Sequence, residues 1–198
     1  DRALQHISQM SSLRDLGLAY TDVTNDGLPQ LQSLTDLKRL DLAGTDVGDK
    51  GLPHLEKMPG LTGLMLNYTR VTDASMASLE KLEQLQELAL IRTRVTNKSM
   101  PSVGKLTELT DLNLDYTDVD DKGFESLSGL AKLQRLSLDS ANVTDASAKV
   151  LSELKQLRKL NLYHTFFTDK GYQQIRTALP ECSIIFDPKS SDAKRRRS

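Results

Sequence analysis

The chain has 198 residues and a formal net charge of −1, from 26 lysine and arginine side chains against 27 aspartate and glutamate side chains. This balance predicts no partner through bulk charge. No apolar run approaches the roughly 18 residues that span a membrane, so we expect no membrane span. The single cysteine excludes an internal disulfide and any multi-cysteine zinc site. Leucine occupies 35 positions while tryptophan is absent, a monotony that indicates a repeat.

A leucine-initiated unit recurs along the chain at one constant spacing, without insertion. Each unit opens with Leu-x-x-Leu-x-Leu, as in residues 37–42, and this alternation predicts a short strand. Threonine stands eight residues after the first leucine in every unit except the one with Ala141, and valine or phenylalanine stands ten residues after it. Seven full units follow one another, starting at Leu13, Leu37, Leu61, Leu85, Leu109, Leu133 and Leu157.

A short helix is predicted in the second half of each unit. Its apolar positions recur three residues apart, as at Leu28 and Leu31, and therefore share one helix face. Pro29, Pro53 and Pro101 fall in the first turn, where a missing amide costs least. Asparagine or aspartate stands twelve residues after the first leucine in every unit, and we interpret it as the residue that caps the helix start. These residues are Asn25, Asp49, Asp73, Asn97, Asp121, Asp145 and Asp169.

The two ends differ from the middle. Residues 1–12 match the helical half of a unit, so we expect the chain to begin inside a partial repeat that continues upstream. Seven full repeats then cover 13–180, and 181–186 keeps the strand register with Ile184 and Phe186, as a closing strand would. Residues 187–198 are predicted to be a disordered basic tail. Residues 1–186 are then net acidic, which argues against nucleic-acid binding.

The repeated pattern resembles the leucine-rich repeat family over residues 3–186. It is similar to the bacterial subclass with a Thr-x-Val-Thr-Asp half, as in residues 69–73, and to ribonuclease-inhibitor and F-box repeats. The resemblance implies an α/β solenoid, a right-handed βα superhelix curved into an arc. A parallel sheet of about eight strands is expected on the concave face and short helices on the convex face. Members of the family act as scaffolds, receptors and substrate-recognition subunits.

The outward-facing strand positions are mostly polar, as solvation of a sheet face requires. Two apolar residues, Met65 and Ile91, depart from this, and Tyr68, Arg92 and Tyr116 fall at equivalent positions of three successive units. Tyrosine, arginine and methionine are enriched in protein interfaces, so we predict a partner-binding patch formed by these five residues. The alternative is that the arginine merely stacks between the two phenol rings.

Two further groups have structural alternatives. Tyr163, His164 and Phe166, in the last full unit, form either a secondary docking patch or a surface under the closing segment. Two residues after the Tyr68 row, a second row contains Asp, Asp, Arg, Arg and Asp in successive units, and we interpret it as structural salt bridges between neighbouring loops. Its members are Asp22, Asp46, Arg70, Arg94 and Asp118.

No catalytic constellation is predicted. His6 and His54 fall on helices and His164 on a loop, so they are not expected to converge with one another or with Cys182. We expect no catalytic residue, no metal and no cofactor.

The sequence therefore predicts a monomeric, non-catalytic binding module that recognises a protein partner on its concave face. Two alternatives stay open: a recognition domain appended to an enzyme or signalling protein whose catalytic part lies upstream of residue 1, and a glycan-binding module.

Overall fold

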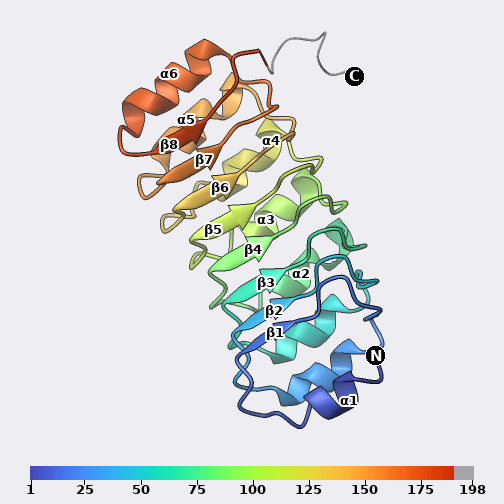
Figure 1. The fold of residues 1–198 in the computed structure, drawn as a ribbon. Helices are drawn as coiled ribbons and strands as arrows, with labels where there is room; N and C mark the ends of the chain where they lie inside the picture. Colours follow the sequence, from blue (N-terminus) through green and yellow to red (C-terminus); the bar gives the residue numbers. More distant parts are fainter. Residues whose placement is uncertain (190–198) are drawn as a thin grey trace.

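The computed structural model describes residues 1–189, which form one open sheet of eight parallel strands in sequence order (Figure 1). Leu16 pairs with Leu40 and Leu40 with Leu64, and the same offset of one repeat continues through the sheet. The predicted period is thus confirmed as the register. The strands are β1 (Asp15–Gly17), β2 (Arg39–Asp41), β3 (Gly63–Met65), β4 (Glu87–Ala89), β5 (Asp111–Asn113), β6 (Arg135–Ser137), β7 (Lys159–Asn161) and β8 (Ser183–Ile185).

Short helices lie on the side opposite the strands (Figure 1). The α-helices are α1 (Leu4–Ile7), α2 (Met76–Leu79), α3 (Met100–Val103), α4 (Asp121–Phe124), α5 (Ala148–Glu153) and α6 (Asp169–Ala178). The 3-10 helices are η1 (Leu28–Ser33), η2 (Leu52–Lys57), η3 (Asp73–Ser75), η4 (Asn97–Ser99), η5 (Glu125–Leu127) and η6 (Asp145–Ser147). Pro29 and Pro53 sit in the first turn of η1 and η2, where an amide has no acceptor within the helix.

One continuous apolar core runs between the strands and the helices. The central leucine of each strand from β2 to β7 faces this core and is at most 2% exposed. These leucines are Leu40, Leu64, Leu88, Leu112, Leu136 and Leu160. The predicted solenoid is confirmed, because each unit buries its apolar face against its neighbours.

The repeated threonine holds the turn that leaves each strand. The Thr45 hydroxyl donates to the carbonyl of Leu42 over 2.6 Å, and Thr69 donates to Leu66 over the same distance. Both threonines are buried. The bond satisfies a strand-end carbonyl within the same repeat, whereas Ala141 has no hydroxyl to donate.

The interpretation of the repeated asparagine or aspartate as a helix cap is wrong. The capping side chain belongs to the preceding residue: Thr72 accepts from the amide of Ala74, and Asp120 from the amide of Lys122. This residue has extended backbone, as the cap position requires.

The repeated aspartate instead joins its own repeat to the next one. Asp73 accepts from the amide of Thr96 over 2.8 Å and from its hydroxyl over 2.7 Å, and the Ser99 hydroxyl donates to the same carboxylate. Burial raises the pKa of the Asp73 carboxyl, but these three hydrogen bonds outweigh it and lower the pKa below its usual value. Asp49 shows the same balance with Thr72 and Ser75. The carboxylates thus form a ladder of inter-repeat bonds.

Two steps of this ladder are built from different pairs. In the first, Asn25 accepts from the amide of Gly48 over 2.8 Å. In the second, Asn97 accepts from the amide of Asp120 over 2.9 Å, and its own amide group donates to the Asp120 carboxylate over 2.7 Å. The exchange is complementary, because an aspartate at position 97 would face a second carboxylate. Asparagine thus appears in the two places where the next repeat carries glycine or aspartate in place of threonine.

The ends extend the same pattern. The Asp1 carboxylate accepts from the amide and the hydroxyl of Thr24, as the ladder residues do. Cys182, next to β8, is buried. The predicted tail falls mainly on 190–198, which lie outside the described residues. Within residues 1–189, no helix combines the length and apolar character needed to cross a membrane.

Candidate functional site

A groove of about 470 Å³ follows the strand face from β2 to β8. The buried strand leucines form its floor, and the outward-facing residues of each strand form its walls. Its wall residues include Arg39, Met65, Glu87, Ala89, Asp111, Asn113, Arg135, Ser137, Lys159, Asn161, Ser183 and Ile185. The groove runs across the strands, along the axis of the solenoid.

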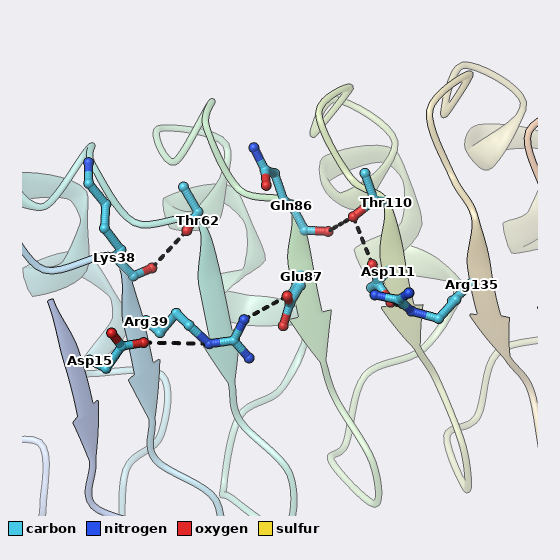
Figure 2. Close-up of polar contacts among 9 residues, drawn as sticks. All are labelled: Asp15, Lys38, Arg39, Thr62, Gln86, Glu87, Thr110, Asp111 and Arg135. Atoms are coloured by element: carbon cyan, nitrogen blue, oxygen red, sulfur yellow. Dashed lines mark hydrogen bonds and ion pairs between the residues drawn. The ribbon is translucent and has the colours of Figure 1, made fainter.

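Ion pairs organise the first part of the groove. Arg39 on β2 reaches past Gly63 to Glu87 on β4, with 2.7 Å between guanidinium and carboxylate, and lies 3.8 Å from Asp15 (Figure 2). The reach depends on Gly63, because a Cβ at that position would lie 3.3 Å from the Cγ of Arg39. The missing side chain on β3 thus lets a charge pair span two strand spacings.

The second half of the groove contains a lysine, Lys159, that is unpaired among residues 1–189. Arg135 on β6 pairs with Asp111 on β5, whose carboxylate also accepts from the Thr110 hydroxyl over 2.7 Å (Figure 2). Lys159 on β7 is exposed and forms no ion pair with any residue of 1–189. With the other four charges paired, the groove keeps one uncompensated positive charge at its β7 end.

The structure divides the five residues of the predicted patch between the strand face and the loops that follow the strands. Met65 lines the groove, and Ile91 is half-buried just beyond the end of β4. Tyr68, Arg92 and Tyr116 are exposed on the loops that follow β3, β4 and β5, outside the groove. They form a rim along the carboxyl ends of the strands.

Within this rim, only one of the two predicted stacking contacts forms. The Arg92 guanidinium lies over the Tyr116 ring, 4.4 Å from its centre. Tyr68 makes no cation–π contact with any residue of the described part of the chain. Tyr68 keeps 49% of its surface exposed and Tyr116 keeps 43%, so both rings remain available to a partner.

The three rim residues and the equivalent residues of the other repeats share a left-handed backbone. The φ angles of Tyr68, Arg92 and Tyr116 lie between 52° and 56°, and only Gly44, at φ 66°, has the residue type that favours this region. A Cβ at Gly44 would come within 2.5 Å of the Tyr20 ring, which lies over that glycine. The loop therefore imposes one geometry on every repeat, and this geometry directs the exposed side chains.

The secondary patch lies at the other end of the same row. The rings of Tyr163 and His164 have centres 3.8 Å apart, and both residues are exposed. His164 Nδ1 lies 3.1 Å from the carboxylate of Asp139. Phe166 is half-buried. The closing strand β8 therefore leaves Tyr163 and His164 accessible.

A half-buried carboxylate lies between the two patches. Asp115 accepts from the backbone amide of Asp139 over 2.7 Å. Burial raises the pKa of the Asp115 carboxyl, and the negative charge of the nearby Asp139 carboxylate raises it further. The hydrogen bonds made to Asp115 lower its pKa, but they do not outweigh burial.

The side chains that could act in catalysis or bind a metal lie far apart in the described part of the chain. His6 is exposed on α1, and His54 on η2 lies 3.2 Å from the Gln32 amide. Burial raises the pKa of the Cys182 thiol, which disfavours the reactive thiolate. Among residues 1–189, no three His, Cys, Asp or Glu side chains are grouped so that they could hold a metal ion.

These features define a repeat solenoid: every repeat adds one strand to an open parallel sheet, the helices lie on the opposite side, and a groove follows the strand face. A family model described as a leucine-rich repeat region matches residues 1–183, and the chain belongs to the leucine-rich repeat family. A search of curated proteins finds no significant match.

Solved structures share this fold at low sequence identity. Internalin C2 from Listeria monocytogenes is similar with a TM-score of 0.74 and 21% identity, over 98% of this chain and 89% of that one. Internalin F from the same organism gives 0.66 and 17%, over 93% and 57%. A leucine-rich repeat protein from Leptospira interrogans gives 0.56 and 19%, over 92% and 62%. The chain thus spans less than two thirds of the latter two.

Sequence reasoning assigned the groove walls to solvation and did not identify the groove itself. Glu87, Arg135 and Lys159 belong to one outward-facing row of mostly charged residues. The signal that was available is Gly63, the one residue without a side chain in that row, which allows Arg39 to reach Glu87.

Proposed function

We propose that this chain is a non-catalytic binding module that holds a protein partner along the concave strand face. The groove from β2 to β8 is the observation that carries the proposal. It crosses six strand spacings of about 4.8 Å, a length of about 29 Å, which matches about nine residues of extended polypeptide. This elongated shape suits a segment of a protein better than a compact small molecule.

The rim adds the groups that such an interface uses. Tyr68, Arg92 and Tyr116 lie beside the groove, and Met65 supplies an apolar surface inside it. An apolar centre bordered by aromatic and arginine side chains is the usual composition of an energetic hot spot. Leucine-rich repeat proteins are commonly protein-binding scaffolds, which supports the same conclusion.

The partner site is tested by chemical crosslinking to identify a partner, followed by titration of purified variants. Tyr68→Ala and Arg92→Ala should each weaken binding by more than about 1 kcal/mol, or about fivefold. Asp22→Ala and Lys98→Ala, exposed away from the patch, serve as controls and should leave the affinity unchanged. Unchanged affinity in both central variants would move the site, most directly to Tyr163 and Phe166.

The absence of catalysis is tested separately. A variant in which His6, His54, His164 and Cys182 are all replaced should fold, and its readout is turnover, because His164 belongs to the secondary patch and its loss can also change partner affinity. A turnover that is measurable in the wild type and lost in this folded variant would contradict the proposal.

A further inference from the structure

Three arginines and two tyrosines project from the loops of three successive repeats. In the loop after β4, Arg92 and Arg94 are exposed on either side of buried Thr93, so both side chains point outward. The same alternation holds for Tyr68 and Arg70 in the preceding repeat. We call the five residues Tyr68, Arg70, Arg92, Arg94 and Tyr116 the arginine–tyrosine cluster.

The salt bridges expected in this row form on one side only. Arg70 pairs with Asp46 over 2.8 Å, as predicted. The symmetric expectation for Arg94 and Asp118 is wrong, because Arg94 forms no ion pair with any residue among 1–189. Arg92 stacks on Tyr116 and likewise has no carboxylate partner there. Two neighbouring guanidinium groups thus form no ion pair with a carboxylate among residues 1–189.

The cluster does not follow from the overall charge or from the fold. Residues 1–189 carry 22 basic and 26 acidic side chains, a net charge of −4. The other full repeats place aspartate, asparagine or phenylalanine at the position of Arg70 and Arg94, and all of them form the same loop. Because an acid at this position is compatible with the solenoid, the two arginines are not required by its packing.

The arrangement also leaves like charges side by side. Arg70 and Arg94 hold equivalent positions in adjacent repeats, where backbones lie about 5 Å apart, and like charges across such a spacing are destabilising. Asp46 compensates Arg70 alone. Asp118 holds the equivalent position on the other side of Arg94 without forming an ion pair with it. An anionic group seated between Arg92 and Arg94 would supply the ion pair that both lack among residues 1–189.

We propose that the arginine–tyrosine cluster binds a segment of the partner rich in aspartate or glutamate, an inference that rests on the proposed function. Guanidinium groups bind carboxylates through paired N–H donors, and the Tyr116 ring holds the Arg92 guanidinium plane in place for such a contact. Tyr68 and Tyr116 flank the arginines with apolar ring surface. Because the proposed partner is a protein, the anionic groups that it can bring to the cluster are aspartate and glutamate side chains, and nucleic acid is the alternative that the test distinguishes.

The test is a fluorescence-polarisation titration of the whole chain with a labelled peptide of eight glutamates. A peptide of eight glutamines and an eight-nucleotide oligo(dT) serve as ligand controls. The double variant Arg92→Gln/Arg94→Gln should weaken octaglutamate binding at least about tenfold at low salt. The matched control Lys122→Gln/Lys149→Gln removes the same charge from exposed helix positions and should change it less than about twofold. Unchanged circular dichroism and unchanged thermal unfolding confirm that each variant is folded.

Three outcomes would overturn the inference: equal loss of affinity in the two double variants, tighter binding of oligo(dT) than of octaglutamate, or no octaglutamate binding at concentrations up to about 1 mM. These outcomes are distinguishable from failure of the proposed function. If octaglutamate does not bind but Tyr68→Ala still weakens the identified partner, the binding module stands and only the acidic chemistry is wrong.

Discussion

Replacing Asn97 by aspartate tests the ladder that joins the repeats. The Asn97 amide donates to the Asp120 carboxylate over 2.7 Å, so Asn97→Asp removes the donor and sets two carboxylates against each other. The amide of Asp120 keeps its acceptor, because an aspartate oxygen can replace the Asn97 oxygen. The change is nearly isosteric, and its effect is therefore almost entirely electrostatic.

The expected loss of stability has two parts. A hydrogen bond to a charged group contributes about 1.5–3 kcal/mol, and two unit charges about 4 Å apart near a protein surface repel by about 4 kcal/mol at most. Side-chain rotation and proton uptake relieve part of this repulsion. We expect Asn97→Asp to lower the free energy of unfolding by about 2–4 kcal/mol at pH 7.

Adding Asp120→Thr should rescue the variant, because the two substitutions together recreate the aspartate–threonine pairing that Asp73 makes with Thr96. In urea titrations, the double variant should return to within about 1 kcal/mol of the wild type, with a coupling energy of about 2 kcal/mol or more. The deficit of Asn97→Asp should shrink as the pH falls, because protonation of one carboxyl restores a donor. Additive effects of the two substitutions would refute the account of the ladder.

Three more predictions concern other layers of the structure. Leu112→Ala should lower the free energy of unfolding by about 2–5 kcal/mol, whereas exposed Lys149→Ala should change it by less than about 0.5 kcal/mol; a loss below about 1 kcal/mol at Leu112 would contradict a packed solenoid. Asp115→Asn should raise the melting temperature at pH 7, because burial raises the pKa of that carboxyl and its ionised form opposes folding; the difference should vanish below about pH 4, and a gain that persists in acid would contradict this cause. Arg92→Gly should be more stable than Arg92→Ala by about 1 kcal/mol in thermal unfolding, since glycine tolerates the left-handed φ of 52°; equal stabilities would mean that the loop relaxes.

The fold could be predicted from the sequence because one period controls every level of it. The constant spacing of the leucines from Leu13 to Leu157 fixes the strands, their register and the common core, and the structure reproduces it in each strand pair. A side chain that acts within its own unit, such as Thr45, is constrained by that unit alone. Asp73 acts between units, and a local capping rule assigned its hydrogen bonds to its own helix. The replacement of aspartate by asparagine in the ladder was nevertheless a signal in the sequence, since Asn97 occurs where the following unit carries Asp120.

The candidate site was harder to predict because it depends on departures from the period. Whether Arg94 pairs with Asp118 depends on side-chain rotamers, whereas the repeat fixes only the backbone. The charge pairing within the groove depends on Gly63 in the same way, because a single missing side chain lets Arg39 reach Glu87.

The left-handed row connects these departures to function. Gly44 shows that the loop accepts the residue type best suited to its backbone, yet six other repeats carry Tyr, Arg, Ser or His there, at φ between 52° and 60°. Each bulky residue at such an angle costs about 1 kcal/mol relative to glycine, so the row lowers stability along the whole solenoid. This cost is only partly offset by packing within the chain, such as the stacking of Arg92 on Tyr116, because Tyr20, Tyr68 and Tyr116 leave 43–75% of their surface in solvent. It is best explained by what the side chains contact outside the chain, which is the surface we propose for the partner.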